Sequence, residues 1–198
     1  SEGEIYKFGD LKLFGNTVIP IEDAKKAVND VMKPGQLFSR SKLEVTKNRL
    51  AFLLGDRGYA FPDIIAVPII NDETRVVDIE FRVNPGTRTT VRRINITGNE
   101  STNDEVYRRE IRQFESSVHS NSKIERSKIR LQRLKYVESV EVKKIKVFES
   151  NDQVDIFFDI TERASGEFKI GAGWSDSQGT LLNATIRQDN FLGTGNNV

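Results

Sequence analysis

The sequence is poor in the residues that carry most protein chemistry. It has no cysteine, one histidine and one methionine, which excludes disulfides and thiolate metal sites but leaves the cellular compartment open. No run of about 18 apolar residues occurs, so the sequence predicts no transmembrane helix. Its 30 basic and 29 acidic residues give a net charge of +1, and this balance does not indicate a nucleic-acid partner. The 37% hydrophobic content is typical of folded domains rather than of a disordered chain.

The few residues able to support catalysis do not form a recognisable site. His119 stands alone between two predicted helices, and we expect it to be solvated rather than part of a Ser-His-Asp arrangement. Gly171-x-Gly173 and Gly193-x-Gly195 lack the third glycine and the following helix of a dinucleotide-binding loop. We therefore predict no enzyme activity, no cofactor and no metal. Because paired acids need not be close in sequence, a hydrolase acting on cell-envelope material stays open as an alternative.

A repeat of about 80 residues organises the chain. Four landmarks recur in the same order at nearly constant spacing, which is hard to obtain by chance. A unit of this size is large enough to fold as a small domain. The landmark pairs are Gly15-Asn16 with Gly98-Asn99, Ser41-x-x-Glu44 with Ser122-x-x-Glu125, Arg49-Leu50 with Arg130-Leu131, and Val77-Asp-Ile79 with Val154-Asp-Ile156.

Each copy is predicted to fold in the order strand, helix, helix, strand, strand. The Gly-Asn pair marks the turn that ends the first strand, because both residues tolerate positive φ. Helical spacing of apolar residues predicts a first helix over 21–31 in copy one. Its counterpart opens at Thr102 and carries Phe114. The remaining segments read as hairpins of paired strands: 61–70 with 74–83, and 137–149 with 153–161.

The second helix of each copy has the clearest signals. Ser41-x-x-Glu44 and Ser122-x-x-Glu125 have the pattern of capping boxes, in which the hydroxyl caps the start of its own helix. Gly55 or Gly58 is expected to end the helix of copy one. Each helix presents one apolar stripe, and burying both helices of a copy against one sheet gives an α+β fold with a three-stranded sheet covered by two helices. The stripes are Leu43, Leu50 and Leu53 in copy one, and Ile124, Leu131 and Leu134 in copy two.

The composition changes after Ser165. Apolar residues alternate with glycine or polar residues over 168–174 and again over 182–186, with a turn predicted between Ser175 and Gly179. Two strands of about ten residues with one apolar face fit a hairpin of a transmembrane β-barrel, and a soluble amphipathic hairpin fits the pattern equally well. The pattern breaks off within 193–198, so we expect the chain to be a piece of a longer protein.

At this point the sequence resembles a known family, the POTRA domains of outer-membrane β-barrel assembly and transport proteins. It is similar to the last two POTRA domains of an assembly factor, followed by the truncated start of the barrel. The domains implied are 1–84, 87–163 and 166–198. The motifs that carry the resemblance are the two Gly-Asn pairs, YRREIRQFE over 107–115, DQVDI over 152–156, the joint Glu162-Arg163 and QDNFLGTG over 188–195.

The resemblance implies a role in inserting β-barrel proteins into the bacterial outer membrane, with residues 1–163 on the periplasmic side. Its implied partners are unfolded outer-membrane protein precursors, accessory lipoproteins of the assembly complex and lipids near the barrel. The alternative within the same family is the POTRA region of a secretion or translocation pore, in which the pair captures one dedicated exported protein.

The open edges of a three-stranded sheet can accept an extended segment of another chain, because backbone groups supply the hydrogen bonds. Pro62 and Pro68 blunt the penultimate strand of copy one, since proline lacks the N–H donor. The matching strand of copy two has no proline, and we predict it as the client-docking edge. The lysines of this strand could instead protect the edge from pairing. The predicted docking residues are Val140, Val142, Lys143, Lys144, Ile145 and Val147.

The helices of copy two offer a second surface. Residues 107–135 contain nine Lys or Arg against three Glu, an excess that suits anionic lipid head groups or an acidic partner as well as an ordinary solvated face. The resemblance implies docking of an accessory lipoprotein near Glu115, and we predict that Arg108, Arg109 and Arg112 take part. Pro85 and Gly86, between the copies, are the predicted inter-domain hinge.

Overall fold

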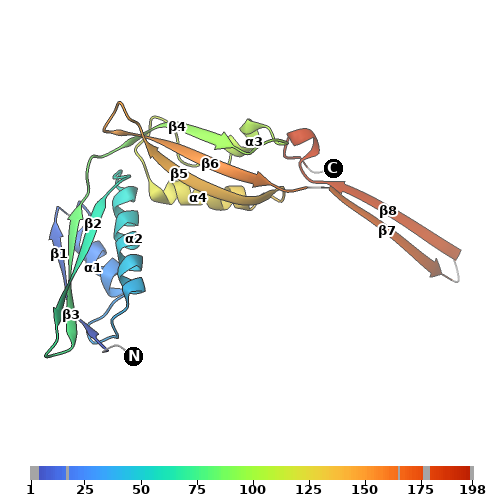
Figure 1. Ribbon diagram of the computed structural model, residues 1–198. Coiled ribbons are helices and arrows are strands. Elements are labelled where there is room, and N and C mark those ends of the chain that lie inside the picture. The colour runs from blue at the N-terminus through green and yellow to red at the C-terminus, as the bar shows by residue number, and fades with distance from the viewer. Residues whose placement is uncertain (1–4, 17, 165, 176–178, 197–198) are drawn as a thin grey trace. The chain divides into compact units, whose positions relative to one another are not determined.

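The computed structural model describes residues 5–16, 18–164, 166–175 and 179–196, and Figure 1 shows its elements. The structure divides into two compact units. One contains Ser1–Arg92, Glu115–Ser122 and Lys146–Val154, and the other contains Arg93–Phe114, Lys123–Ile145 and Asp155–Val198. The division therefore runs through the second repeat rather than between the repeats, and each unit is described by itself below.

The first repeat has the predicted element order. It consists of β1 (Lys7–Gly15), α1 (Ile21–Asn29), α2 (Arg40–Asp56), β2 (Asp63–Asn71) and β3 (Val76–Asn84). β3 lies in the middle of the sheet, parallel to β1 and antiparallel to β2 (Figure 1). β2 is thus an edge strand, joined to its neighbour by a hairpin as predicted.

One helical stripe and the sheet form the core of this repeat. Leu43, Leu50 and Leu54 of α2 are buried against Phe8, Ile79 and Phe81. Leu53 of the predicted stripe packs against this core half-buried, and its neighbour Leu54, which was not in the prediction, is fully buried. Residues at spacings of seven and four lie on one side of a helix, so Leu54 follows Leu50 correctly.

The second repeat consists of β4 (Thr90–Thr97), α3 (Asp104–Arg108), α4 (Asn121–Gln132), β5 (Val137–Lys146) and β6 (Gln153–Glu162). Its sheet order is β4-β6-β5, the same arrangement as in the first repeat. The predicted helix through Phe114 is much shorter, since α3 ends at Arg108 and Phe114 is 63% exposed in the following loop. The two copies therefore share their sheet order but not the length of their first helix.

The paired glycines show why the repeat needs this residue. Gly15 and Gly98 have φ of +106° and +79°, and a Cβ there would lie 2.2 Å from the Val83 carbonyl oxygen and 2.0 Å from that of Ile160. Any side chain would clash with the backbone of the central strand, in addition to the strain of the left-handed conformation. Both Gly-Asn landmarks thus mark a close approach of two backbones.

The predicted helix caps turned out differently. α2 begins at Arg40 with Ser39 at the N-cap and no capping side chain, so Ser41 lies inside the helix, where its hydroxyl contacts that of Ser39 at 2.7 Å. Ser122 likewise lies inside α4, and Thr102 precedes the N-cap of α3. The hydroxyls of Ser122 and Thr102 bond to distant residues instead, as described below.

The end of α2 agrees with the prediction. Gly58 has φ of +102°, and its N–H donates to the Gly55 carbonyl at 3.2 Å while that of Tyr59 donates to Leu54 at 3.1 Å. These two bonds form a Schellman motif, in which a glycine in the left-handed conformation closes the helix.

After the second repeat come an antiparallel hairpin of β7 (Gly166–Ser175) and β8 (Gly179–Gln188) and then the short 3-10 helix η1 (Phe191–Gly193). Its register pairs Phe168 with Ile186, Ile170 with Ala184 and Ala172 with Leu182 on one face. The side chains of Phe168, Ile170, Leu182 and Ile186 are each more than 60% exposed. The predicted alternation is therefore confirmed, whereas positions 176–178 of the predicted turn lie outside the described residues.

Candidate interaction surfaces

β5 lies at the edge of its sheet, which is the position that strand addition requires. Val140 is buried, Val142 half-buried, and Ile145 51% exposed. Val147 follows the end of the strand and is buried. Along the exposed stretch the strand presents Lys143, Lys144 and Ile145 to solvent.

Lys143 is occupied on the face of its own sheet. Its ammonium lies 3.6 Å from the carboxylate of Asp159 in β6, which also accepts a hydrogen bond from the Thr97 hydroxyl of β4 at 3.1 Å. These contacts cross all three strands. They hold the Lys143 ammonium toward the central strand of the sheet, although its side chain is 59% exposed.

β2 is the competing edge. It carries Pro68, whereas Pro62 lies before the strand begins. Ile65, Ile69 and Ile70 are 52%, 48% and 59% exposed, so this edge is more apolar than sequence reasoning suggested. Proline removes one backbone donor, and it leaves the rest of this apolar strand accessible.

The predicted lipoprotein-docking residues occupy different environments. Arg108 bonds to Asp104 within α3 and to the Ile94 carbonyl at 3.2 Å. The side chains of Arg109, Arg112 and Glu115 are exposed in and after the α3 turn. The three arginines belong to the unit that contains α3, while Glu115 belongs to the other unit.

His119 contradicts the prediction of a solvated loop residue. It is fully buried, and its Nδ1 lies 3.0 Å from the Gly55 carbonyl near the end of α2. Its backbone N–H donates to Thr89 at 3.1 Å, and Thr89 in turn donates to the Gly58 carbonyl through both its N–H and its hydroxyl. The histidine is thus a buried structural residue whose ring contacts a carbonyl group near a helix end.

Asp56, the last residue of α2, anchors the start of α4 in the same unit. Its carboxylate accepts hydrogen bonds from the Ser122 N–H at 2.6 Å, the Ser122 hydroxyl and the Ser120 hydroxyl at 2.9 Å. The Asn121 side chain also donates a hydrogen bond to the Phe52 carbonyl at 3.2 Å. A carboxylate beside the first N–H groups of a helix is favourable for both hydrogen bonding and the helix dipole. Asp56 therefore does from a distance what Ser122 was predicted to do locally.

The predicted hinge residues lie next to this junction. The Gly86 N–H donates to the Asn84 side chain at 3.1 Å, and Gly86 has φ of +71°. Arg88, two residues on, donates from Nε to the Arg57 carbonyl at 3.2 Å. A hinge at Pro85 and Gly86 stays a prediction, and any motion there would have to release these contacts or stop short of Arg88.

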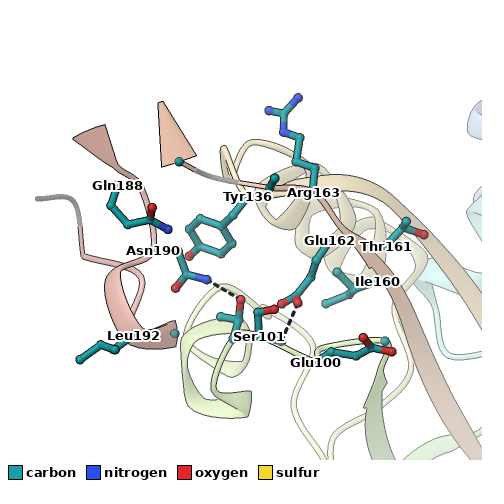
Figure 2. Close-up of a pocket in the computed structure, with 15 residues that line it drawn as sticks. Glu100, Ser101, Tyr136, Ile160, Thr161, Glu162, Arg163, Gln188, Asn190 and Leu192 are labelled. Carbon is teal, nitrogen blue, oxygen red and sulfur yellow. Dashed lines mark hydrogen bonds between the residues drawn. The ribbon is translucent and has the colours of Figure 1, made fainter. Parts of the chain in front are cut away.

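A polar network lies at the end of the second repeat (Figure 2). The Glu162 carboxylate accepts hydrogen bonds from the Tyr107 hydroxyl at 2.7 Å and the Ser101 N–H at 2.8 Å. Burial alone would raise the pKa of Glu162, but hydrogen bonds from Thr102, Tyr107 and the backbone hold it below its usual value. Burial is also the main cause that raises the pKa of Tyr107. Glu162 is therefore an ionised acceptor at neutral pH.

The segment after β8 docks onto this network. Asn190 is buried, donates from Nδ2 to the Thr102 hydroxyl at 2.7 Å, and accepts the Gly195 N–H at 2.8 Å. The Asn103 N–H donates to the Gly193 carbonyl at 3.0 Å. We call residues 189–195 the clasp. The resemblance implied that this segment belongs to the start of a barrel, and the structure shows that it also binds the loop before α3. Beside the clasp lies a cavity of about 740 Å³, bordered by Glu162, Tyr136 and Gln188 among others (Figure 2).

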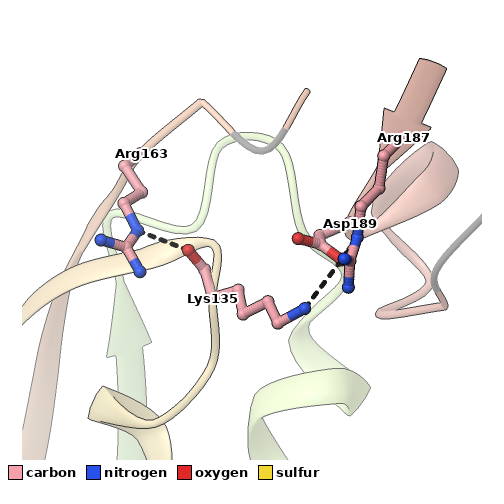
Figure 3. A network of polar contacts seen from close by, with 4 residues as sticks. All are labelled: Lys135, Arg163, Arg187 and Asp189. Carbon is pink, nitrogen blue, oxygen red and sulfur yellow. Dashed lines mark hydrogen bonds and ion pairs between the residues drawn. The ribbon is translucent and has the colours of Figure 1, made fainter. Parts of the chain in front are cut away.

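Both connections of the hairpin attach to one short segment of the second repeat (Figure 3). Arg163, before β7, donates from Nε to the Lys135 carbonyl and from its N–H to the Tyr136 carbonyl at 3.1 Å. After β8, the Asp189 carboxylate pairs with Lys135 at 3.4 Å and with Arg187 at 3.3 Å. The base of the hairpin is thus held on both sides.

Among the described residues, no group of three or more His, Cys, Asp or Glu side chains could hold a metal ion. None of the described helices is long and apolar enough to cross a membrane.

Two tandem modules of the order strand, helix, helix, strand, strand, followed by a hairpin with one apolar face, are the features by which the class of this protein can be stated. The family model POTRA, described as surface antigen variable number repeat, matches residues 6–86 and 89–163, and the chain belongs to this family. The particular proteins that it resembles over its whole length are outer membrane protein assembly factors named BamA. That of Neisseria meningitidis is 35% identical over 195 residues, which are 98% of this chain and 24% of the relative. That of Buchnera aphidicola is 30% identical and is matched over 32% of its length.

Solved structures agree with these relatives. BamA from Haemophilus ducreyi lacking POTRA domains 1–3 is 36% identical, with a TM-score of 0.74 over 97% of this chain and 36% of that one. BamA POTRA3–5 from Haemophilus influenzae is 29% identical, with a TM-score of 0.73 over 79% of this chain and 61% of that one. The chain spans about a quarter to a third of the curated relatives.

Proposed function

We propose that this chain is a scaffold of outer-membrane protein assembly, working by binding and not by catalysis. The observation that carries the proposal is the combination of two POTRA modules with an apolar-faced hairpin, similar throughout to the BamA proteins. Because the chain covers a minor part of those relatives, the activity and partners of the whole protein belong to this proposal. It places the hairpin in the outer membrane and residues 1–163 on the periplasmic side.

We propose β5 as the edge that binds unfolded barrel precursors. Support comes from its edge position, the absence of proline and the engagement of Lys143 by Asp159. An added strand would hydrogen-bond to backbone groups, so one edge could serve clients of different sequence. This low sequence demand suits a protein that handles many barrel precursors.

The other proposed partners use different surfaces. Accessory lipoproteins are proposed to dock through Arg108, Arg109, Arg112 and Glu115, and exposed charges of this kind govern association rate and specificity more than affinity. Because Asp104 already pairs with Arg108 and Glu110 lies 3.9 Å from Arg109, Arg112 is the strongest candidate for contact with an acidic partner. Outer-membrane lipids are proposed to meet the chain where the hairpin joins the second repeat.

An NMR titration of the isotope-labelled chain tests the docking edge. The probe is a peptide with the sequence of β7, GEFKIGAGWS, which has the alternation of a barrel strand. Shift changes confined to residues 138–148 support docking at β5. Changes confined to the helices, or to β2, contradict it. The control peptide carries proline at alternate positions and should cause no shifts, because it cannot complete the hydrogen-bond ladder.

A further inference from the structure

Leu192 combines two features that are rarely found together. Its φ of +50° and ψ of +31° lie in the left-handed region, which is unfavourable for a side chain of this size. The side chain is nevertheless 80% exposed, so burial within the described protein does not compensate for the strain. Backbone strain held in place in this way points to a contact made with something else.

The clasp fixes Leu192 in this conformation from both sides. Before it, the Asn190 side chain is buried on Thr102. After it, a Cβ on Gly193 would lie 2.4 Å from the Ser101 carbonyl oxygen, and the Gly193 carbonyl accepts the Asn103 N–H. The backbone on each side of Leu192 is thus pressed against the second repeat, and the leucine between them is directed to solvent.

The surroundings of Leu192 indicate what it meets. Phe191 beside it is 45% exposed, and both residues follow the end of β8 closely. The apolar face of the hairpin reaches its base with the pair Phe168 and Ile186. Each strand has 10 residues, the length that spans a bilayer when tilted.

Positive charge lies at the base of the same hairpin, around Asp189. The side chains of Lys135 and Arg187 are 53% and 49% exposed, and they share the single carboxylate of Asp189. Arg163 is exposed beside them (Figure 3). A hairpin base that carries two exposed apolar side chains and exposed cations matches the boundary of a phospholipid layer, where acyl chains meet phosphate groups.

We propose that Phe191 and Leu192 insert into the periplasmic leaflet of the bilayer as an anchor, with Lys135 and Arg187 facing lipid phosphates. The inference rests on the proposed placement of the hairpin in the membrane. The clasp then couples the second repeat to the membrane surface, because the same loop binds Thr102 on one side and lipid on the other.

Site-specific fluorescence tests the anchor on the full 198-residue chain, since the absence of cysteine allows one label at a chosen position. The environment-sensitive dye NBD is attached at Leu192→Cys, with Ile170→Cys on the hairpin and Gln132→Cys on α4 for comparison. Vesicles contain equal parts of phosphatidylethanolamine and phosphatidylglycerol, with brominated lipids as quenchers. We expect a blue shift on vesicle addition and quenching by shallow bromines at 192, quenching by deeper bromines at 170, and neither effect at 132.

The outcomes separate the inference from the function it rests on. A label at 170 that enters lipid while that at 192 stays in water overturns the anchor and leaves the hairpin placement standing. If neither label enters lipid, both proposals fail. A label at 192 that is already blue-shifted before vesicles are added also overturns the anchor, because protein then covers that position.

Two substitutions distinguish lipid contact from a packing role. Leu192→Gly and Leu192→Asn both tolerate the left-handed backbone, so the chain should unfold at the same or a higher denaturant concentration. Vesicle affinity should fall about tenfold, as expected for the loss of one partly inserted leucine. Leu37→Asn, at a leucine that is 61% exposed in the other unit, is the matched control and should leave affinity unchanged. Lowered stability with unchanged affinity for the Leu192 variants would contradict the proposal.

Discussion

Asn190 and Thr102, which are 88 positions apart, are joined by a buried hydrogen bond of 2.7 Å from the Asn190 side chain to the Thr102 hydroxyl. Thr102 also bonds to Glu162 at the end of β6. This threonine therefore links Asn190, which follows the hairpin, to the strand that precedes the hairpin. The repeat and the hairpin are therefore connected by side chains as well as by the covalent chain.

Asn190→Ala should loosen the clasp without unfolding the sheets. It removes two hydrogen bonds of a buried side chain, which costs about 1–3 kcal/mol. Hydrogen exchange of the Asn103 and Gly195 amides, which donate within the clasp, should accelerate, while exchange in β6 stays the same. Asn190→Gly keeps the backbone conformation, whose φ is +67°, and should show the same acceleration if the side chain is responsible. Unchanged exchange in both variants would show that the clasp does not depend on Asn190.

Glu162 should make the stability of the second repeat depend on acid. Its pKa is lowered in the folded state, so its contribution is present at neutral pH, above the unfolded carboxyl value of about 4.3, and is lost as pH falls through the folded value. The free energy of unfolding of Glu162→Gln should therefore differ most from that of the wild type at pH 7 and converge with it on acidification. In Tyr107→Phe, a carboxyl NMR titration should find the pKa of Glu162 raised toward normal. An unaltered titration would exclude the Tyr107 hydroxyl as a cause.

Asp56→Ala should destabilise the unit that contains α2. The variant leaves the Ser122 and Ser120 donors without their carboxylate, for a loss of about 2 kcal/mol in urea unfolding. Asp56→Asn should lower the free energy of unfolding by less, since an amide oxygen still accepts a hydrogen bond. The exposed Asp63 at the start of β2 provides the control, and Asp63→Ala should change stability by less than about 0.5 kcal/mol. Equal effects at the two positions would refute the role given to Asp56.

Three glycines with positive φ allow strain and close approach to be separated. Gly35→Ala places a Cβ with no described atom within 4 Å. Its free energy of unfolding should therefore fall by only about 1 kcal/mol, because of the strain of the left-handed backbone. Gly15→Ala and Gly98→Ala add contacts of 2.2 and 2.0 Å with a carbonyl oxygen. Their free energy of unfolding should fall by at least about 2 kcal/mol more than that of Gly35→Ala. Urea unfolding of the three variants measures the difference. A loss at Gly35 as large as at Gly98 would contradict the close-approach explanation of the repeat.

Local patterns predicted most of the fold. Periodicity located the helices and strands, and the twin Gly-Asn pairs located turns that prove to be steric requirements. Capping boxes failed because the pattern cannot show that a hydroxyl has a stronger distant partner, as Ser122 has in Asp56. The same limit applies to His119, since the carbonyl that its ring contacts belongs to Gly55, 64 positions away.

The interaction surfaces were less predictable than the fold. Exposed isoleucines on β2 and the division of Arg112 and Glu115 between units depend on packing across elements. The clasp residues were visible only as a motif, and their use against Thr102 requires the folded second repeat. The strained conformation of Leu192 has no local sequence signal, because leucine rarely adopts it.

The central claim is that β5 receives barrel precursors during assembly. The most direct measurement is photo-crosslinking while the full protein, reconstituted in vesicles, inserts an outer-membrane precursor. A photoreactive phenylalanine analogue is placed at Ile145 on β5, with Ile69 on β2 and Gln132 on α4 as matched exposed positions. We expect precursor adducts from position 145 to be well above those from positions 69 and 132. Adducts from 145 no more abundant than from 132 would contradict it.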